Sequence, residues 1–198
     1  NGPLPADDVQ AISGQLAKAI DYAHRSGITH RDIKPGNVMV SRNGTVKLMD
    51  FGLAKPTADN SDADRVLVGT PGYMAPELFN QGEPGPKSDL FAMGCLAVEL
   101  LTGQKLFNQS QPHEFVAAIA KWSGWDPKSL DITISEELAN AITSWLDPSP
   151  QNRMANLESV SQWAATVQLP EDVEILNSFD EFDPTWTEDD TLDSTETF

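Results

Sequence analysis

Residues 30–37 read HRDIKPGN and residues 38–50 continue VMVSRNGTVKLMD, and this stretch decides the fold of the chain. Its second part contains two short runs of β-forming residues on either side of Asn43-Gly44. An Asn-Gly pair accepts the positive φ angles that a tight turn requires, so the pattern predicts a β-hairpin. The hairpin folds the chain back, and the residues that precede and follow it are expected to meet at one end.

Three oxygen-bearing side chains flank the predicted hairpin: Asp32 and Asn37 before it and Asp50 after it. Two carboxylates and a carboxamide oxygen form a site of hard oxygen ligands that suits Mg²⁺. Lys34 adds a positive charge beside them. Such a group can hold metal ions on phosphate oxygens, orient a hydroxyl and stabilise a phosphoryl group during its transfer. A lone Asp or Asn in such a place ordinarily caps a turn, so the catalytic interpretation depends on all four residues.

Helical patterns surround this stretch on both sides. Asp7 is expected to cap a helix that ends near Gly27 and carries a regular apolar stripe (Val9, Ile12, Leu16, Ile20 and Ala23). Ser88 is expected to cap a second helix that runs to about Thr102 and is apolar on nearly every face, as a buried central helix is. Further helices are predicted at about residues 112–122, 135–146 and 157–167, with a long ordered loop over residues 51–86. The fold class is therefore mainly α with a small β-hairpin.

Charge divides the chain into two parts. The net charge is −17, and residues 171–198 contain 11 Asp or Glu and no Lys or Arg. The remaining 170 residues hold 13 basic and 19 acidic residues, a net charge of −6. Because helical periodicity fades after residue 169, we predict a domain over residues 1–169 and an acidic, disordered tail over residues 170–198. The alternative for the tail is a docking segment, since it holds aromatic residues in an acidic context that suit a basic partner groove.

Composition limits the partners and the compartment. Neither part of the chain offers a basic surface, so we expect no nucleic-acid partner. We see no signal-peptide pattern and no stretch that approaches the roughly 18 apolar residues of a membrane helix. The single cysteine, Cys95, suits a reducing environment, and we expect a cytoplasmic protein. The first residue is Asn1, which indicates a piece of a longer chain.

Three motifs appear in a characteristic order. Residues 30–37 match H-R-D-x-K-x-x-N, residues 50–52 are Asp-Phe-Gly, and residues 75–77 are Ala-Pro-Glu. The sequence resembles the protein kinase family, in which these motifs follow one another in this order. The resemblance covers about residues 4–169. It implies the C-terminal lobe of the α+β kinase fold, without the N-terminal lobe.

The resemblance assigns a role to each of the four polar residues. It implies that Asp32 is the base for the substrate hydroxyl and that Lys34 neutralises the γ-phosphate during transfer. Asn37 and Asp50 would hold Mg²⁺ on the phosphates of ATP. The implied cofactors are ATP and Mg²⁺, and the implied substrates are Ser and Thr hydroxyls of proteins. The Ser/Thr preference follows from Lys34 and from Thr70, whose hydroxyl would point toward Asp32 and Lys34.

Other residues match structural positions of the family. Asp89 would hold the backbone of the catalytic loop (residues 30–37) from the second helix, and Glu77 would pair with Arg153. The resemblance favours a structural His30, whose ring would pack on Phe51, over a general base.

Two further expectations concern histidines and regulation. His24 and His113 show no partner pattern and are interpreted as surface or packing residues. Arg31 beside Asp32 is typical of kinases that are switched on by phosphorylation of the activation loop, and we expect Thr57 or Ser61 to be such a site, with an unmodified polar loop as the alternative.

Three functions remain to be weighed. An active protein Ser/Thr kinase is favoured, because Asp32, Lys34, Asn37 and Asp50 are all present. A pseudokinase or scaffold would be the better interpretation if the N-terminal lobe lacked its ATP-binding Lys. A small-molecule phosphotransferase ranks last, because it would lack the Lys34 position and the loop that ends at residues 75–77. A Gly-rich loop and a strand Lys are absent upstream of Asp7, so we expect little or no phosphotransfer from this chain alone.

Overall fold

The computed structural model describes residues 2–51, 55–56, 69–80, 82–109, 111–130, 132–154 and 157–165. These ranges contain five α-helices: α1 (Ala6–Arg25), α2 (Pro86–Thr102), α3 (Pro112–Ala120), α4 (Glu136–Trp145) and α5 (Glu158–Ser161). The strands are β1 (Ile28–Thr29), β2 (Val38–Val40), β3 (Val46–Leu48) and β4 (Lys55–Pro56). The predicted class, mainly helical with a small antiparallel sheet, is confirmed for the described residues.

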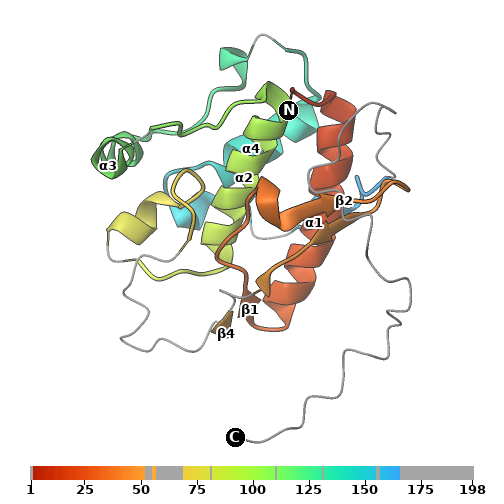
Figure 1. The fold of residues 1–198 in the computed structure, drawn as a ribbon, viewed down its shortest axis with the longest axis horizontal. Helices are drawn as coiled ribbons and strands as arrows, with labels where there is room; N and C mark the ends of the chain where they lie inside the picture. Colours follow the sequence, from red (N-terminus) through yellow and green to blue (C-terminus); the bar gives the residue numbers. More distant parts are fainter. Residues whose placement is uncertain are drawn as a thin grey trace, which may run out of the picture.

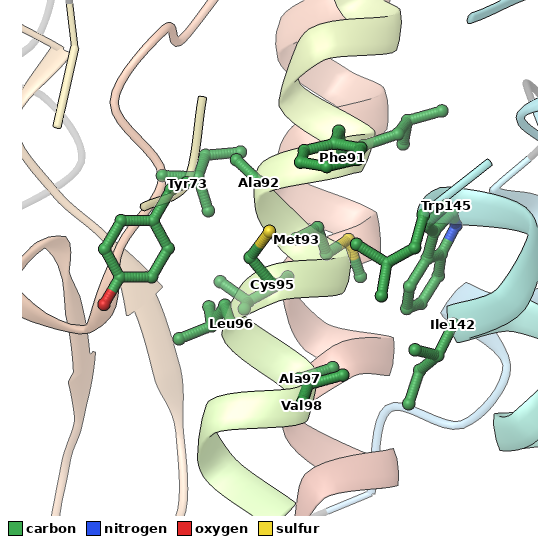
Figure 2. Close-up of a cluster of buried hydrophobic side chains, with 14 of the residues drawn as sticks. Tyr73, Phe91, Ala92, Met93, Cys95, Leu96, Ala97, Val98, Ile142 and Trp145 are labelled. Atoms are coloured by element: carbon green, nitrogen blue, oxygen red, sulfur yellow. The ribbon is translucent and has the colours of Figure 1, made fainter. Parts of the chain in front are cut away.

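Helix α2 lies at the centre and packs against both α1 and α4 (Figure 1). It is buried because nearly every face of it is apolar: Phe91, Met93 and Leu96 are each at most 1% exposed. Figure 2 shows its side chains reaching toward Tyr73 on one side and Trp145 of α4 on the other. A helix that is apolar all round can only be stable in such a position.

The helices begin earlier than their predicted caps. Helix α2 starts at Pro86, and Ser88 sits in its first turn, where its hydroxyl accepts a hydrogen bond from Gly85 N and donates one to Gly85 O (both 2.8 Å). Helix α1 starts at Ala6, with Asp7 inside its first turn rather than at the cap. Proline suits the first helical position because it has no N–H to leave unsatisfied. Helix α2 accordingly starts at Pro86, two residues before the expected cap Ser88.

The apolar stripe of α1 is confirmed, since Val9, Ile12, Leu16, Ile20 and Ala23 are all buried. Residue Gly27, two positions beyond the end of the helix, has a φ of 74°, which glycine adopts without strain.

Two of the later helices match their predictions and the last does not. Ser135 caps α4 by accepting a hydrogen bond from Leu138 N (3.1 Å). Helix α3 ends at Ala120, close to its expected end. Helix α5 is only four residues long, Glu158–Ser161, although a helix over 157–167 was predicted. The chain turns after α5 to pack on α1, where a Cβ on Gly14 would lie only 2.5 Å from Ala164 N.

The predicted hairpin is confirmed as β2 paired antiparallel with β3, with Val38 opposite Leu48 and Val40 opposite Val46. Its turn differs from the expected Asn-Gly form, because Gly44 has a φ of 77° while Asn43 does not have a positive φ. Ser41 N donates to Thr45 O (2.9 Å) and Gly44 N donates to Ser41 O (2.8 Å). This is a longer loop that needs glycine at one position only.

A second antiparallel pair was not predicted. Strands β1 and β4 pair two residues each, with Ile28 opposite Pro56 and Thr29 opposite Lys55. Elements this short leave no alternation in the sequence. Among the described helices, none is long and apolar enough to cross a membrane.

Candidate active site

The catalytic loop lies between β1 and β2, and α2 holds its backbone. Asp89 of α2 is 2% exposed, and its two carboxylate oxygens accept hydrogen bonds from His30 N and Arg31 N (both 2.9 Å). Arg31 has a φ of 71°, an unusual conformation for a residue with a side chain. The Asp89 carboxylate supports this conformation, and the predicted role of Asp89 is confirmed.

Asp32 is a buried side chain of the loop that several polar groups contact. It is 8% exposed, and its Oδ2 lies 2.7 Å from Lys34 Nζ, while its Oδ1 accepts a hydrogen bond from Thr70 Oγ1 (2.7 Å). Asn37 Nδ2 donates to the Asp32 carbonyl oxygen (2.8 Å) and to Oδ2 (3.1 Å). Three side chains from two segments of the chain therefore converge on one carboxylate.

These contacts determine the charge state of Asp32. Burial alone acts to raise the pKa of the carboxyl, but the hydrogen bonds from Lys34, Thr70 and Asn37 and the positive charge of Lys34 act in the opposite direction. The net result is a pKa below the ordinary value. Asp32 is therefore an anion at neutral pH, as an acceptor of hydroxyl hydrogen bonds must be.

Lys34 and Thr70 complete this cluster as the sequence predicted. Lys34 Nζ donates to Thr70 Oγ1 (2.9 Å), which in turn donates to Asp32. Thr70 belongs to the segment that leads to the short 3₁₀ turn η4 (Pro76–Phe79). Its hydrogen bonds with Asp32 and Lys34 therefore join this segment to the catalytic loop. A pocket beside them is lined by Asp32, Ile33, Thr70, Met74 and Ala92.

Asn37 and Asp50 lie at the two ends of the hairpin that adjoin the catalytic loop. The ends are joined by a hydrogen bond from Met49 N to Asn37 O (2.8 Å). Asn37 is buried with its amide nitrogen committed to Asp32, so its carboxamide oxygen is the atom suited to a cation. Asp50 is exposed and has a φ of 58°. The hairpin thus brings together the residues that the sequence placed at one end.

The donor set fits Mg²⁺. No group of three or more His, Cys, Asp or Glu in the described part of the chain is arranged to hold a metal ion. Mg²⁺ does not require such a cage, because it retains several waters and binds through one or two carboxylates and the phosphates of its nucleotide. Asp50 and Asn37 provide one carboxylate and one carboxamide for that mode of binding.

His30 is a structural residue, as predicted. Its Nε2 donates to Met49 O (3.0 Å), which leaves Nδ1 to accept from Asp32 N (3.3 Å). Its ring meets the Phe51 ring edge to face, with 4.7 Å between centroids. Both ring nitrogens are occupied by the backbone, so His30 connects the catalytic loop to the end of β3 and takes no part as a base.

His24, expected to be a surface or packing residue, is partly buried and packs against Asp89, a partner that no sequence pattern indicated. Its Nε2 lies 2.8 Å from Asp89 Oδ2, the oxygen that also accepts from His30 N. Because a carboxylate can only accept hydrogen bonds, His24 Nε2 is the donor in this contact, as His30 N is in the other. The two residues are 65 positions apart, and no local pattern marks such a pair.

The predicted pair of Glu77 and Arg153 is confirmed. Arg153 is 2% exposed and donates to the two Glu77 carboxylate oxygens at 2.7 and 2.8 Å. Its remaining donors reach the carbonyl oxygens of Asp147 (2.8 Å), Lys87 (2.9 Å) and Pro148 (3.4 Å). This pair links η4, which holds Glu77, to the segment that follows α4 in the chain, which holds Arg153.

Some predictions fall on residues that the structure does not describe. These are Gly52 of the Asp-Phe-Gly motif, the expected phosphorylation sites Thr57 and Ser61, and the tail over residues 170–198.

Comparison with known proteins agrees with this geometry. The protein kinase domain family matches residues 1–164 of the chain. Serine/threonine-protein kinase 36 of Mus musculus is 36% identical over 155 residues, which is 78% of this chain and 12% of the mouse protein. Serine/threonine-protein kinase TIO of Arabidopsis thaliana is 36% identical over 151 residues, 76% of this chain and 11% of that protein.

A bacterial relative is also similar. Serine/threonine-protein kinase PknB of Mycobacterium leprae is 31% identical over 155 residues, 77% of this chain and 25% of that protein. The chain thus spans a quarter or less of the length of these relatives. The match of the family over most of the chain, together with these relatives, establishes that the chain belongs to the serine/threonine protein kinase family.

Proposed function

We propose that the protein to which this chain belongs transfers the γ-phosphate of ATP to Ser and Thr hydroxyls of protein substrates. The observation that supports this most directly is the cluster around Asp32, in which one anionic carboxylate is held by Lys34, Thr70 and Asn37. The relatives named above are serine/threonine-protein kinases.

In the proposed reaction Asp32 accepts a hydrogen bond from the substrate hydroxyl and orients its oxygen toward the phosphorus. Thr70 Oγ1 now lies on Asp32 Oδ1 at 2.7 Å, a distance typical of a hydroxyl on a carboxylate. Lys34, whose Nζ lies 2.7 Å from the other carboxylate oxygen, Oδ2, would balance the negative charge of the phosphoryl group as it moves. Phosphoryl transfer requires little more of a protein than positioning and charge stabilisation.

Asn37 and Asp50 are the residues that would hold Mg²⁺. The ion would supply positive charge to the phosphates of ATP, which is its general part in this chemistry. The contribution of the chain itself is to keep both oxygen ligands at the end of one hairpin, where the Met49 N to Asn37 O hydrogen bond joins them.

We also propose that the fold is the C-terminal lobe of a kinase, with a domain boundary near residue 169. The helical character of the described residues and the position of the catalytic loop support the lobe assignment. A cytoplasmic location and a docking partner for the acidic tail stay predictions. A scaffold without activity is not favoured, because Asp32, Lys34, Asn37 and Asp50 are all present.

The proposal is tested with the full-length protein, Mg²⁺ and γ-labelled ATP, on a mixture of Ser-, Thr- and Tyr-containing peptides. We expect label on Ser and Thr and none on Tyr, and loss of labelling in Asp50→Asn. Asp21→Asn is the matched control, since this carboxylate forms a surface pair with Arg25 on α1. Absence of any labelling by a folded wild-type protein that binds ATP would favour the scaffold instead.

A further inference from the structure

One amide side chain, that of Gln15, joins three backbone groups from two distant segments. Gln15 lies on α1, where its Oε1 accepts a hydrogen bond from Val46 N (2.8 Å). Its Nε2 donates to Gly44 O (3.0 Å) and to Ala165 O (2.8 Å). Val46 and Gly44 belong to the hairpin, and Ala165 follows α5. The side chain therefore uses both of its polar atoms to tie α1 to the hairpin and to the end of the described chain.

The hairpin needs this support. A two-stranded antiparallel sheet is marginally stable in water, and β2 and β3 contribute three residues each. One end of the hairpin carries Asn37 and Asp50 and is joined by Met49 N and Asn37 O. Gln15 holds the opposite end of the hairpin at Val46. The four residue steps from Val46 to Asp50 span about 13 Å in extended chain. The orientation of the two proposed metal ligands thus depends on where α1 holds the turn.

The segment after α5 shares the same amide nitrogen. A Cβ on Gly14 would lie 2.5 Å from Ala164 N, so the backbone of α1 and that of residues 163–165 are in direct contact beside Gln15. Because Nε2 donates both to this segment and to the hairpin turn, the two are linked through one group. This segment leads directly to the acidic residues at the C-terminus of the chain.

We propose that Gln15 is a positioning residue for phosphoryl transfer: it sets the position of the hairpin that carries Asn37 and Asp50, and it couples that position to the segment that follows α5. The inference rests on the proposed function, because it concerns the metal ligands of that site. Its consequence is that the affinity for the catalytic Mg²⁺ depends on an amide that touches neither metal nor substrate.

The test measures the Mg²⁺ concentration for half-maximal activity, at saturating ATP, in the full-length kinase. Gln15→Glu keeps an acceptor for Val46 N but replaces the donor to Gly44 and Ala165 by a carboxylate oxygen. Gln15→Met keeps the length of the side chain and removes all three hydrogen bonds. We expect both to raise the Mg²⁺ requirement about tenfold, the factor that corresponds to about 1.4 kcal/mol or one to two net hydrogen bonds. Gln104→Glu, the same substitution at an exposed position after α2, should leave it unchanged.

A second readout separates positioning from general stability. Hydrogen exchange at the Val46 amide should accelerate in Gln15→Met, with the melting temperature measured on the same sample. If the melting temperature falls while the Mg²⁺ requirement stays that of the wild type, Gln15 is only structural and the proposal is wrong.

Failure of the proposed function has a different signature. If Asp50→Asn had the same Mg²⁺ dependence as the wild type, Asp50 would not be a metal ligand, and the inference about Gln15 would fall with that role. Asp50→Asn that is inactive, combined with Gln15 variants of unchanged Mg²⁺ dependence, would overturn the inference alone.

Discussion

Arg153 and Asp32 are two of the charged side chains that are buried in the described part of the chain, and their surroundings differ. Arg153 is enclosed: its guanidinium meets both oxygens of Glu77 and three backbone carbonyls. Asp32 is held by Lys34, whose side chain is 30% exposed, and by the hydroxyl of Thr70. Three of the five oxygen acceptors around Arg153 are backbone carbonyls. The contacts of the Asp32 carboxylate come from the side chains of Lys34, Thr70 and Asn37.

Burial of a charge therefore does not by itself identify a catalytic residue. A saturated buried charge stabilises one arrangement of the chain. A buried charge held by side chains, one of them 30% exposed as Lys34 is, has a partner that solvent and other molecules can reach. We therefore expect substitutions at Glu77 to change stability and substitutions at Asp32 to change rate.

The largest effect on stability is expected from Glu77→Gln. It leaves the Arg153 charge buried without a counter-charge, and removing one partner of a buried pair costs about 3–5 kcal/mol. Urea unfolding measures this difference. The matched control is Arg25→Met, which breaks a surface pair on α1 at 2.8 Å and should cost about 0.2–1 kcal/mol. Equal costs for the two variants would remove the distinction between an enclosed and an exposed pair.

An intermediate effect is expected from Gly94→Ala. The added Cβ would lie 2.7 Å from Leu146 Cγ, where α2 and the end of α4 meet. Overpacking of a filled core costs about 1–3 kcal/mol, and the melting temperature should fall accordingly. Gly36→Ala serves as the control, because a Cβ there meets only the flexible Lys34 side chain at 3.8 Å. A melting temperature for Gly94→Ala equal to that of the control would mean that the two helices separate without cost.

A smaller effect on stability is expected from Thr70→Val, in the cluster around Asp32. Valine has nearly the same shape but removes the hydroxyl between Lys34 and Asp32, so the loss should be about 1 kcal/mol for one net hydrogen bond. If Thr70 were instead an enclosed partner like those of Arg153, the cost in urea unfolding would approach that of Glu77→Gln.

The smallest effect is a pH dependence. The folded-state pKa of Asp32 is lowered from its ordinary value of 3.8, so the carboxylate contributes stability that is fully present above that value. The contribution is lost as the pH falls below 3.8 and through the folded pKa. In Asp32→Asn the decline of the free energy of unfolding in this acid range should be shallower than in the wild type. An identical decline in the two proteins would indicate that the Asp32 pKa is not lowered.

Much of the site was predictable because its residues are close in sequence. Asp32, Lys34 and Asn37 lie within six positions, and the hairpin that returns to Asp50 carries a strong turn signal. Asp89 and the pair of Glu77 and Arg153 were reached only through the resemblance to kinases, since they are distant in the chain.

The rest depended on tertiary contacts that leave no local pattern. His24 and Asp89 are 65 positions apart, and Gln15 is 150 positions from Ala165. The sheet of β1 and β4 pairs two residues on each strand, too few to show alternation. The short α5 ends at Ser161, and the backbone of Trp163 and Ala164 just beyond it packs on Gly14; helical periodicity alone gave no reason for a stop there.

The turnover rate of Asp32→Asn in the full-length kinase tests whether the cluster of Asp32, Lys34, Thr70 and Asn37 performs the chemistry. Loss of a positioned base lowers turnover by about 10²–10⁴-fold, and we expect a loss of that size with a melting temperature close to that of the wild type. Wild-type turnover in a correctly folded Asp32→Asn protein would show that Asp32 is not the base.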